Sequence, residues 1–309
     1  MANKFSLALA EGACKNCPME QQTHGLAFGD GFTRAQAITR QYAKTFYFAS
    51  RFLPREKRSA AYAVYALCRI TDNTVDNDGH TSAIQALRAI GTSISRVYSA
   101  ADLNDTLLLA FKETVERYRI PRNCFDELLE GMGMDLEKQR YRNFDELYSY
   151  CYRVAGVVGL IMLRVFGYQQ PEAERHAVEL GVAMQLTNIV RDIKEDYRRG
   201  RIYVPQDEME QCMVSEDHIA GEKVDGAFKT LLSMQISRAR HYYDSAAKGV
   251  ALIDNLRCRL VVVLMKELYA GILTAVEKNN YDVFSRRAHL SPPRKVIKAV
   301  QCLLRREYW

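Results

Sequence analysis

Residues 185–205 read QLTNIVRDIKEDYRRGRIYVP, and within them Asn188, Asp192 and Asp196 follow one another at intervals of four residues. In a helix this spacing puts the three side chains on one face, with neighbouring Cβ atoms about 5–6 Å apart. Two carboxylates that close repel each other mildly unless a cation lies between them. The apolar run at 180–190 predicts a buried helix, in which an unpaired charge is costly. The stretch therefore predicts a core helix whose polar end holds a metal ion.

A second stretch, YALCRITDNTVDN at residues 65–77, repeats the spacing with Asp72 and Asp76. Magnesium prefers a few carboxylates, several waters and the oxygens of a phosphorylated substrate. Two acidic pairs that face each other across a helical cavity would hold Mg²⁺ against a diphosphate. A single pair of this kind is common on solvated helix faces. Two matched pairs, each after an apolar run, favour metal–diphosphate chemistry.

A diphosphate also needs cations on its outer oxygens, and the planar guanidinium group of arginine suits phosphate. Arg69 lies three residues before Asp72, and Arg191 adjoins Asp192. Because they share helices with the acids, we interpret both arginines as diphosphate contacts. Lys44 is a further candidate, although a lone lysine also fits an ordinary surface position.

Residues 154–160 read VAGVVGL, a small apolar stretch that would leave room for a long hydrocarbon. Close helix packing explains its glycines equally well. Aromatic residues are dense near the acids, and π faces that line a cavity would stabilise carbocations. Tyr203 and Tyr269 are candidates for hydrogen bonds to a diphosphate.

The chain has 309 residues, 48% apolar and 26% charged, which excludes a mostly disordered protein. Apolar residues recur at intervals of three and four, no alternating strand pattern is present, and so we predict an all-α fold. Residues 1–32 are expected to form a flexible N-terminal arm, and residues 33–309 one catalytic domain. The predicted helices cover residues 33–53, 56–76, 82–99, 104–118, 122–139, 144–167, 171–197, 224–249, 254–279 and 292–306.

Several classes of protein are excluded. No run approaches the roughly 18 apolar residues of a membrane span, and the N-terminus is not a signal peptide, so a cytoplasmic protein is expected. Basic residues are interspersed with acids, which argues against nucleic-acid binding. Cys14 and Cys17 lack the second pair that a zinc site needs, and their role stays open.

Six stretches, taken in order, resemble the phytoene/squalene synthase family over about residues 34–305. They are YAKTFYFASRFLP, YALCRITDNTVDN, LLEGMGMDL, YCYRVAGVVGL, QLTNIVRDIKEDYRRGRIYVP and NNYDVFSRRA. The resemblance implies an isoprenoid synthase helical bundle with a central cavity. It also implies head-to-head joining of two prenyl diphosphates with Mg²⁺, or with Mn²⁺ as an alternative.

Matched motif by motif, the resemblance implies a first metal site at Asp72 and Asp76 and a second at Asn188, Asp192 and Asp196. The four aspartates, with Arg69 and Arg191, are the expected catalytic residues. The expected substrate-binding residues are Lys44, Thr45, Phe46, Tyr65, Arg69, Tyr150, Val154, Val158, Gln185, Arg191, Tyr203, Tyr269 and Arg286.

The expected reaction passes through a cyclopropylcarbinyl diphosphate. Phytoene from two geranylgeranyl diphosphates is the first hypothesis. Dehydrosqualene, squalene or presqualene diphosphate from farnesyl diphosphate is the near alternative, with NADPH needed only for squalene. A head-to-tail prenyltransferase, a terpene cyclase and a non-catalytic helical scaffold are the more distant alternatives.

The C-terminal stretch PPRKVIKAVQCLLRREYW, residues 292–309, is basic and predicts an amphipathic helix. Contact with a membrane surface would give an apolar product a lipid sink. Packing of the helix on the domain explains the pattern equally well. The sequence leaves the oligomeric state open.

Overall fold

The computed structural model describes residues 23–77, 80–99 and 102–304, with the backbone alone over 23–28, 71–77 and 80–82. These residues form helices and two isolated β-bridges, and they contain no strand. In chain order the helices are α1 (Thr23–Tyr42), α2 (Lys44–Ser50), α3 (Arg55–Asn77), α4 (His80–Val97), α5 (Thr106–Arg117), α6 (Asn123–Glu137), α7 (Phe144–Cys151), the π-helix η2 (Tyr152–Gly156), α8 (Val157–Phe166), α9 (Glu172–Arg198), α10 (Gln206–Gln211), α11 (Glu216–Ala220), α12 (Gly226–Ala247), the 3₁₀ helix η3 (Val250–Leu252), α13 (Leu256–Lys278) and α14 (Pro292–Leu304).

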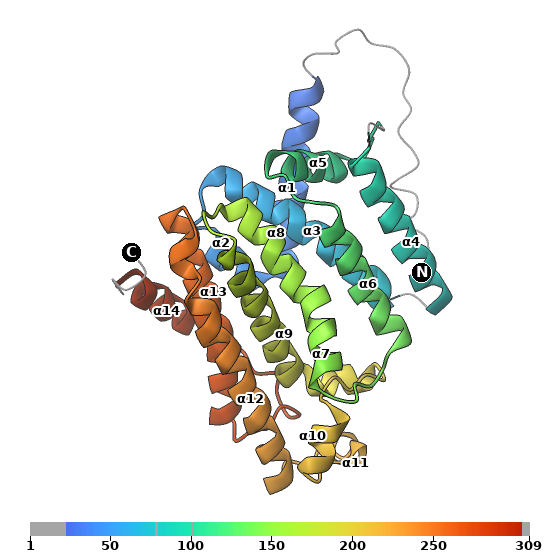
Figure 1. The fold of residues 1–309 in the computed structure, drawn as a ribbon, viewed down its shortest axis with the longest axis vertical. Helices are drawn as coiled ribbons and strands as arrows, with labels where there is room; N and C mark the ends of the chain where they lie inside the picture. The colour runs from blue at the N-terminus through green and yellow to red at the C-terminus, as the bar shows by residue number, and fades with distance from the viewer. Residues whose placement is uncertain (1–22, 78–79, 100–101, 305–309) are drawn as a thin grey trace.

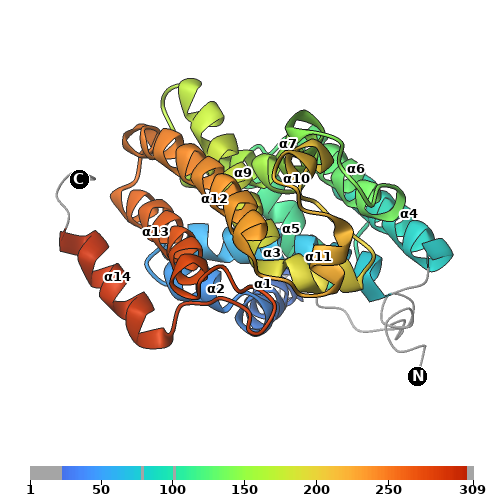
Figure 2. The same cartoon turned by 90° about the horizontal axis from the view of Figure 1, so that it is seen from below.

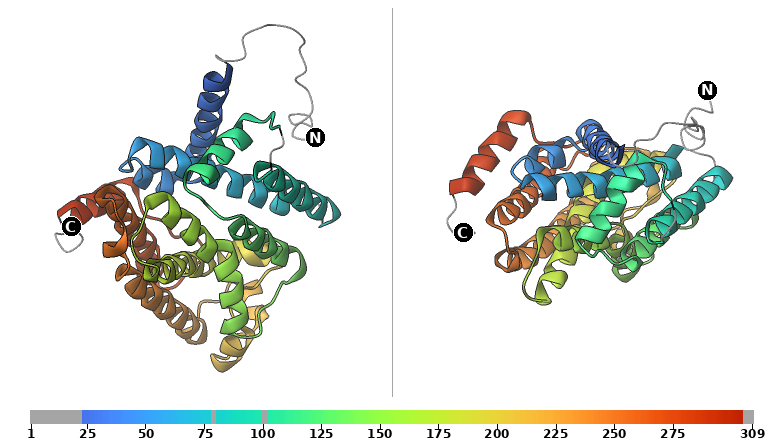
Figure 3. Two further views of the ribbon diagram at one scale, coloured as in Figure 1. Left: turned by 45° about the horizontal axis from the view of Figure 1, so that its top comes forward. Right: turned by 90° about the horizontal axis from the view of Figure 1, so that it is seen from above.

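Helix α9, which carries the second acidic motif, lies in the middle of the bundle (Figure 1). It packs against α12 and α13 on one side and against η2 and α8 on the other. Helix α1 projects from the bundle and packs on α3 and α5 (Figure 3). Seen from below, α14 lies at the outer edge beside α13 (Figure 2).

Two glycines set the close approach of α9 to its neighbours. A Cβ at Gly181 would lie 2.2 Å from the backbone oxygen of Ala155, and one at Gly159 would lie 2.2 Å from that of Ala177. No side chain fits at those distances, so only glycine allows the backbones to approach this closely. The close-packing interpretation of the VAGVVGL glycines therefore holds for Gly159.

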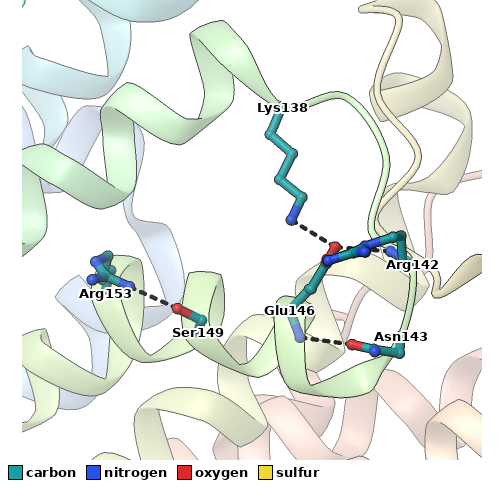
Figure 4. A network of polar contacts seen from close by, with 6 residues as sticks. All are labelled: Lys138, Arg142, Asn143, Glu146, Ser149 and Arg153. Atoms are coloured by element: carbon teal, nitrogen blue, oxygen red, sulfur yellow. Dashed lines mark hydrogen bonds and ion pairs between the residues drawn. The ribbon is translucent and has the colours of Figure 1, made fainter.

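A polar network fixes the start of α7 (Figure 4). The side chain of Asn143 accepts a hydrogen bond from the backbone N–H of Glu146 at 3.1 Å, which is the usual N-cap interaction. The Glu146 carboxylate in turn accepts from Lys138 Nζ at 2.6 Å and from the backbone N–H of Arg142 at 3.0 Å. The carboxylate thereby ties the loop before α7 to the helix that carries Tyr150.

The helical run Phe144–Phe166, which contains the π-helix η2, is long and apolar enough to cross a membrane by length and composition alone, contrary to the expectation that no segment of the chain approaches such a span. Its neighbours in the bundle are α6, α9 and α3. Helix α9 covers one side of the run and α6 another, as expected for a core helix of the bundle.

Two boundaries differ from the sequence-based expectation. The helix predicted over 33–53 is two helices, because the backbone of Ala43 leaves the helical region with φ −121° and ψ 59°. Helix α1 also begins at Thr23, so residues 23–32 of the expected arm are helical in the structure. Residues 1–22, with Cys14 and Cys17, lie outside the described residues.

Candidate active site

A cavity of about 830 Å³ lies among α2, α3, η2, α8, α9 and α13. Its wall is apolar over most of its extent, with side chains such as Val158, Met162, Leu180, Val262 and Met265. Polar and cationic side chains gather on another part of the wall. The expected substrate and metal residues that line the cavity are Lys44, Thr45, Phe46, Tyr65, Val154, Val158, Gln185, Asn188, Arg191 and Tyr269.

Four cationic side chains line the polar part of the cavity: Lys44, Arg191, Arg287 and Lys295. Lys295 Nζ donates a hydrogen bond to Thr45 Oγ1 at 2.8 Å and therefore links the start of α14 to α2. Burial and the neighbouring charge of Lys44 lower the pKa of Lys295, as expected where positive charge is crowded. This part of the wall suits a polyanionic ligand.

Asp192 lies where α9 departs from helical geometry, with φ −108° and ψ 16°. Its carboxylate accepts from Arg191 Nε at 2.7 Å and from Arg287 Nε and Nη2 at 2.7 and 2.8 Å. Burial alone would raise the pKa of Asp192, but these hydrogen bonds outweigh it and hold the pKa below its usual value. Both arginines also line the cavity, so Asp192 orients two cationic groups of the cavity wall.

Asp196 is the least compensated acid of the described site. Burial, followed by the charges of Asp192 and Asp135, raises the pKa of Asp196 to about 8. The charges of Arg199 and Arg201 lower this pKa but do not offset the burial and the two neighbouring acids, so the Asp196 carboxylate in this acidic cluster remains incompletely compensated. Such a cluster gains from a bound cation.

Asp135, at the end of α6, belongs to this acidic cluster and was not predicted. It accepts hydrogen bonds from Tyr203 Oη at 2.7 Å and from Tyr150 Oη at 3.1 Å. The two tyrosine rings stack with centroids 5.0 Å apart. Asp135 stands in the LLEGMGMDL stretch, but it has no second acid at helical spacing that could have singled it out.

Tyr150 and Tyr203 were expected to contact substrate, and the structure places both on Asp135 instead. Both are buried, at 3% and 6% exposure, and neither lines the cavity. Their described role is to hold the Asp135 carboxylate. Tyr269, in contrast, lines the cavity as predicted, and burial raises the pKa of its hydroxyl.

Arg286 was expected at the diphosphate, but its guanidinium binds Asn279 Oδ1, with Nε at 2.9 Å. The next residue, Arg287, lines the cavity and binds Asp192. The segment lies outside helices, where spacing does not predict which of two adjacent side chains points inward. Of the two adjacent arginines, the structure places Arg287 and not Arg286 in the cavity wall.

The first acidic motif lies at the end of α3. The side chains of Asp72 and Asp76 lie outside the described residues, so their pairing with α9 stays a prediction. Arg69, one turn earlier, does not line the cavity, and its guanidinium lies over the ring of Tyr42, 4.8 Å from the centroid. Its Nε is buried and has no hydrogen-bond partner among the described residues. A buried N–H donor of this kind normally has an acceptor, and an anionic or carbonyl oxygen would satisfy the Nε of Arg69.

The residues of α9 fit a divalent cation. Asn188 donates its Nδ2 to Gln185 Oε1 at 3.2 Å, which leaves its Oδ1 available as an oxygen ligand. Asp196 adds carboxylate oxygens two turns later. Asp192, one turn after Asn188, would add its own in exchange for hydrogen bonds from Arg191 and Arg287. Hard oxygen donors of this kind suit Mg²⁺ or Mn²⁺. In the part of the chain whose side chains are described, no three histidine, cysteine or acidic side chains form a complete site.

Comparison with known proteins places this chain among catalysts of isoprenoid chemistry. Residues 39–294 match the squalene/phytoene synthase family. Phytoene synthase 2, chloroplastic, of Solanum lycopersicum is 39% identical over 277 residues, which cover 87% of this chain and 88% of that protein. The 15-cis-phytoene synthase of Synechococcus elongatus is 36% identical over 292 residues, covering 90% of this chain and 94% of that protein.

Solved structures agree with the sequence relatives. A dehydrosqualene synthase in complex with ligand has a TM-score of 0.84 and 28% identity, covering 89% of this chain and 96% of that one. A squalene synthase from Alicyclobacillus acidocaldarius has a TM-score of 0.77 and 26% identity, covering 83% and 97% of the two chains. The described helices therefore form the same all-α bundle as these enzymes.

Proposed function

This chain belongs to the squalene/phytoene synthase family, and on that premise we propose that it joins two molecules of geranylgeranyl diphosphate head-to-head into phytoene. The observation that carries the proposal is one cavity with two chemical characters. Lys44, Arg191, Arg287 and Lys295 line its polar part together with Gln185 and Asn188, and most of the remaining wall is apolar. A prenyl diphosphate likewise combines an anionic diphosphate group with an apolar hydrocarbon chain.

The polar part of the cavity supports departure of the diphosphate. When the C1–O bond of the donor breaks, negative charge grows on the leaving group, and preorganised guanidinium and ammonium groups stabilise it. Arg191 and Arg287 are held in place by Asp192, so they are oriented before the substrate binds. The acceptor double bond then attacks the allylic cation, and loss of a proton gives the cyclopropylcarbinyl diphosphate.

The second half of the reaction takes place in the same cavity. The intermediate loses its diphosphate, rearranges and releases a proton to give the C40 hydrocarbon, so each half-reaction yields one diphosphate and one proton. The apolar wall keeps water from the carbocations, which would otherwise be quenched as alcohols. Because the reaction ends with the loss of a proton and not with the transfer of a hydride, the formation of phytoene needs no NADPH.

Members of this family are in general dependent on a divalent metal. Asn188, Asp192 and Asp196 would hold it from α9, and we propose that Asp72 and Asp76 do so from α3. When bound, the metal supplies positive charge to the leaving diphosphate.

The test uses the purified full chain with Mg²⁺ and either geranylgeranyl or farnesyl diphosphate, followed by mass spectrometry of the extracted lipid. We expect phytoene and two diphosphates per hydrocarbon from the C20 substrate. Lys44→Gln should lower kcat/KM about 10–100-fold, because a charge-assisted contact to the diphosphate is lost. Arg40→Gln, on the preceding helix and outside the cavity, is the matched control and should change little.

The other outcomes separate the alternatives. Dehydrosqualene from the C15 substrate alone would assign the activity of the structural neighbour instead. Squalene formed only with NADPH would point to the reductive branch. Absence of any hydrocarbon from folded protein with either substrate would overturn the proposal.

A further inference from the structure

We infer that the outer face of α14 lies on the surface of a bilayer containing anionic lipid and that α14 gives the cavity its contact with that bilayer. The inference rests on the proposed function, because a C40 hydrocarbon needs a lipid phase to receive it. Of the eight large apolar side chains exposed in the described part of the chain, five belong to α14. They are Val296, Ile297, Val300, Leu303 and Leu304, with exposures of 45–75%.

These five residues form one stripe. Val296, Val300 and Leu303 follow one another at helical intervals of four and three residues. Ile297 lies three residues before Val300 and Leu304 four residues after it, so they extend the same stripe. The opposite side of α14 buries Ala299 and Cys302. Within the described part of the chain, α14 packs extensively against α13 alone, at the outer edge of the bundle (Figure 2). The stripe therefore faces away from the bundle.

The same helix forms part of the cavity wall. Lys295, in its first turn, lines the cavity and binds Thr45, and Leu290, just before the helix, also lines it. Lys298 Nζ binds Glu267 on α13 at 2.7 Å and fixes the helix on its other side. One short helix thus joins the substrate cavity to an exposed apolar surface.

The charge of this segment favours an anionic membrane over a second copy of the chain. Residues 285–306 contain seven lysines and arginines and no aspartate or glutamate. Arg287 and Lys298 are paired with Asp192 and Glu267, and Lys295 lines the cavity. The exposed basic residues without an acidic partner in the described part of this segment are therefore Arg286 and Arg294. A two-fold dimer through this face would bring each basic segment against its own copy, and like charges would repel. A basic amphipathic helix with an apolar stripe is instead suited to a negatively charged lipid surface.

The experiment is flotation of the full chain with vesicles of phosphatidylcholine alone or with one third phosphatidylglycerol. We expect binding to the anionic vesicles, and loss of about tenfold or more of that binding in the triple variant Ile297→Ser, Val300→Ser, Leu304→Ser. The control is Met213→Ser with Leu256→Ser, two exposed apolar residues elsewhere. The control variant should bind as the unaltered chain does.

A parallel assay in detergent micelles separates this inference from the proposed function. The triple variant should keep its turnover in micelles and lose it on vesicles, because the cavity residues are unchanged. Turnover by the unaltered chain in micelles tests the activity alone, whatever the flotation result. The inference is overturned if the triple variant floats as well as the unaltered chain. It is also overturned if ultracentrifugation shows a dimer that the triple variant dissociates while no form binds vesicles.

Discussion

Arg287 binds Asp192 through two parallel hydrogen bonds, from Nε at 2.7 Å and from Nη2 at 2.8 Å, and so joins the segment after α13 to the C-terminal part of α9. Arg191 holds the same carboxylate from within α9. Asp192 therefore positions two cations that line the cavity. The fork geometry of arginine, and not only its charge, should matter at residue 287.

We predict that Arg287→Lys lowers kcat/KM about 10–100-fold, because lysine keeps the charge but makes a single contact in place of the two-bond pair. Arg286→Lys is the matched control, since Arg286 binds Asn279 and does not line the cavity. Release of diphosphate, measured continuously, reports both variants. A greater loss in the Arg286 variant than in the Arg287 variant would show that the assignment of the two arginines is reversed.

A second prediction concerns the packing of α9. Gly181→Ala should lower the free energy of unfolding by about 1–3 kcal/mol, because its Cβ would lie 2.2 Å from the backbone oxygen of Ala155. Gly133→Ala, on α6, meets only Leu87 Cδ2 at 3.7 Å and should be neutral or slightly stabilising. Urea denaturation of the two variants measures the difference. Equal stabilities would mean that the contact at Gly181 relaxes at little cost.

The parts of this protein that the sequence predicts are those that depend on local spacing. Helical periodicity locates most of the bundle, and the interval of four residues places Asn188, Asp192 and Asp196 on α9. The break at Ala43 has no proline or glycine to mark it, and it separates α1 from α2.

The parts of the site that escape prediction depend on contacts between distant segments. Asp135 belongs to the acidic cluster because its charge acts on Asp196, and it is held by Tyr150 and Tyr203, which come from two other parts of the chain. The choice of Arg287 over Arg286 depends on how an irregular segment meets α9. No local pattern encodes either relationship, because the partners are brought together only by the complete fold.

A third prediction uses the network at the start of α7. Hydrogen bonds from Lys138 and Arg142 lower the pKa of Glu146 from its usual 4.5 to about 2. Because the folded-state pKa is depressed, the stabilisation by this carboxylate is present above about pH 4.5 and is lost as the pH falls toward 2. Glu146→Gln should therefore destabilise the protein at pH 7 and match the unaltered chain near pH 2.

The measurement is thermal or urea unfolding of both proteins between pH 2 and 7. Glu210→Gln serves as the control, because Glu210 is exposed and forms no ion pair among the described residues. A stability difference at Glu146 that does not change over this range would assign the effect to lost packing and not to charge.

The last prediction concerns the length of the prenyl chain that the cavity accepts. Gly249 and His176 both line the cavity, and a Cβ at Gly249 would lie 2.3 Å from His176 Cβ. The imidazole is tied to Glu179 at 2.9 Å, so it has little freedom to move away from an added methyl group. Gly249→Ala should therefore displace wall atoms into the cavity and shorten the space for hydrocarbon.

A change of about one methyl group in an apolar pocket alters selectivity roughly 10–200-fold. We expect the ratio of kcat/KM for the C20 over the C15 diphosphate to fall by about tenfold. Gly226→Ala, where nothing lies within 4 Å, controls for an effect of alanine itself. An unchanged ratio in a folded Gly249→Ala protein would place the end of the hydrocarbon elsewhere in the cavity, because a wall that the substrate does not reach cannot discriminate between chain lengths.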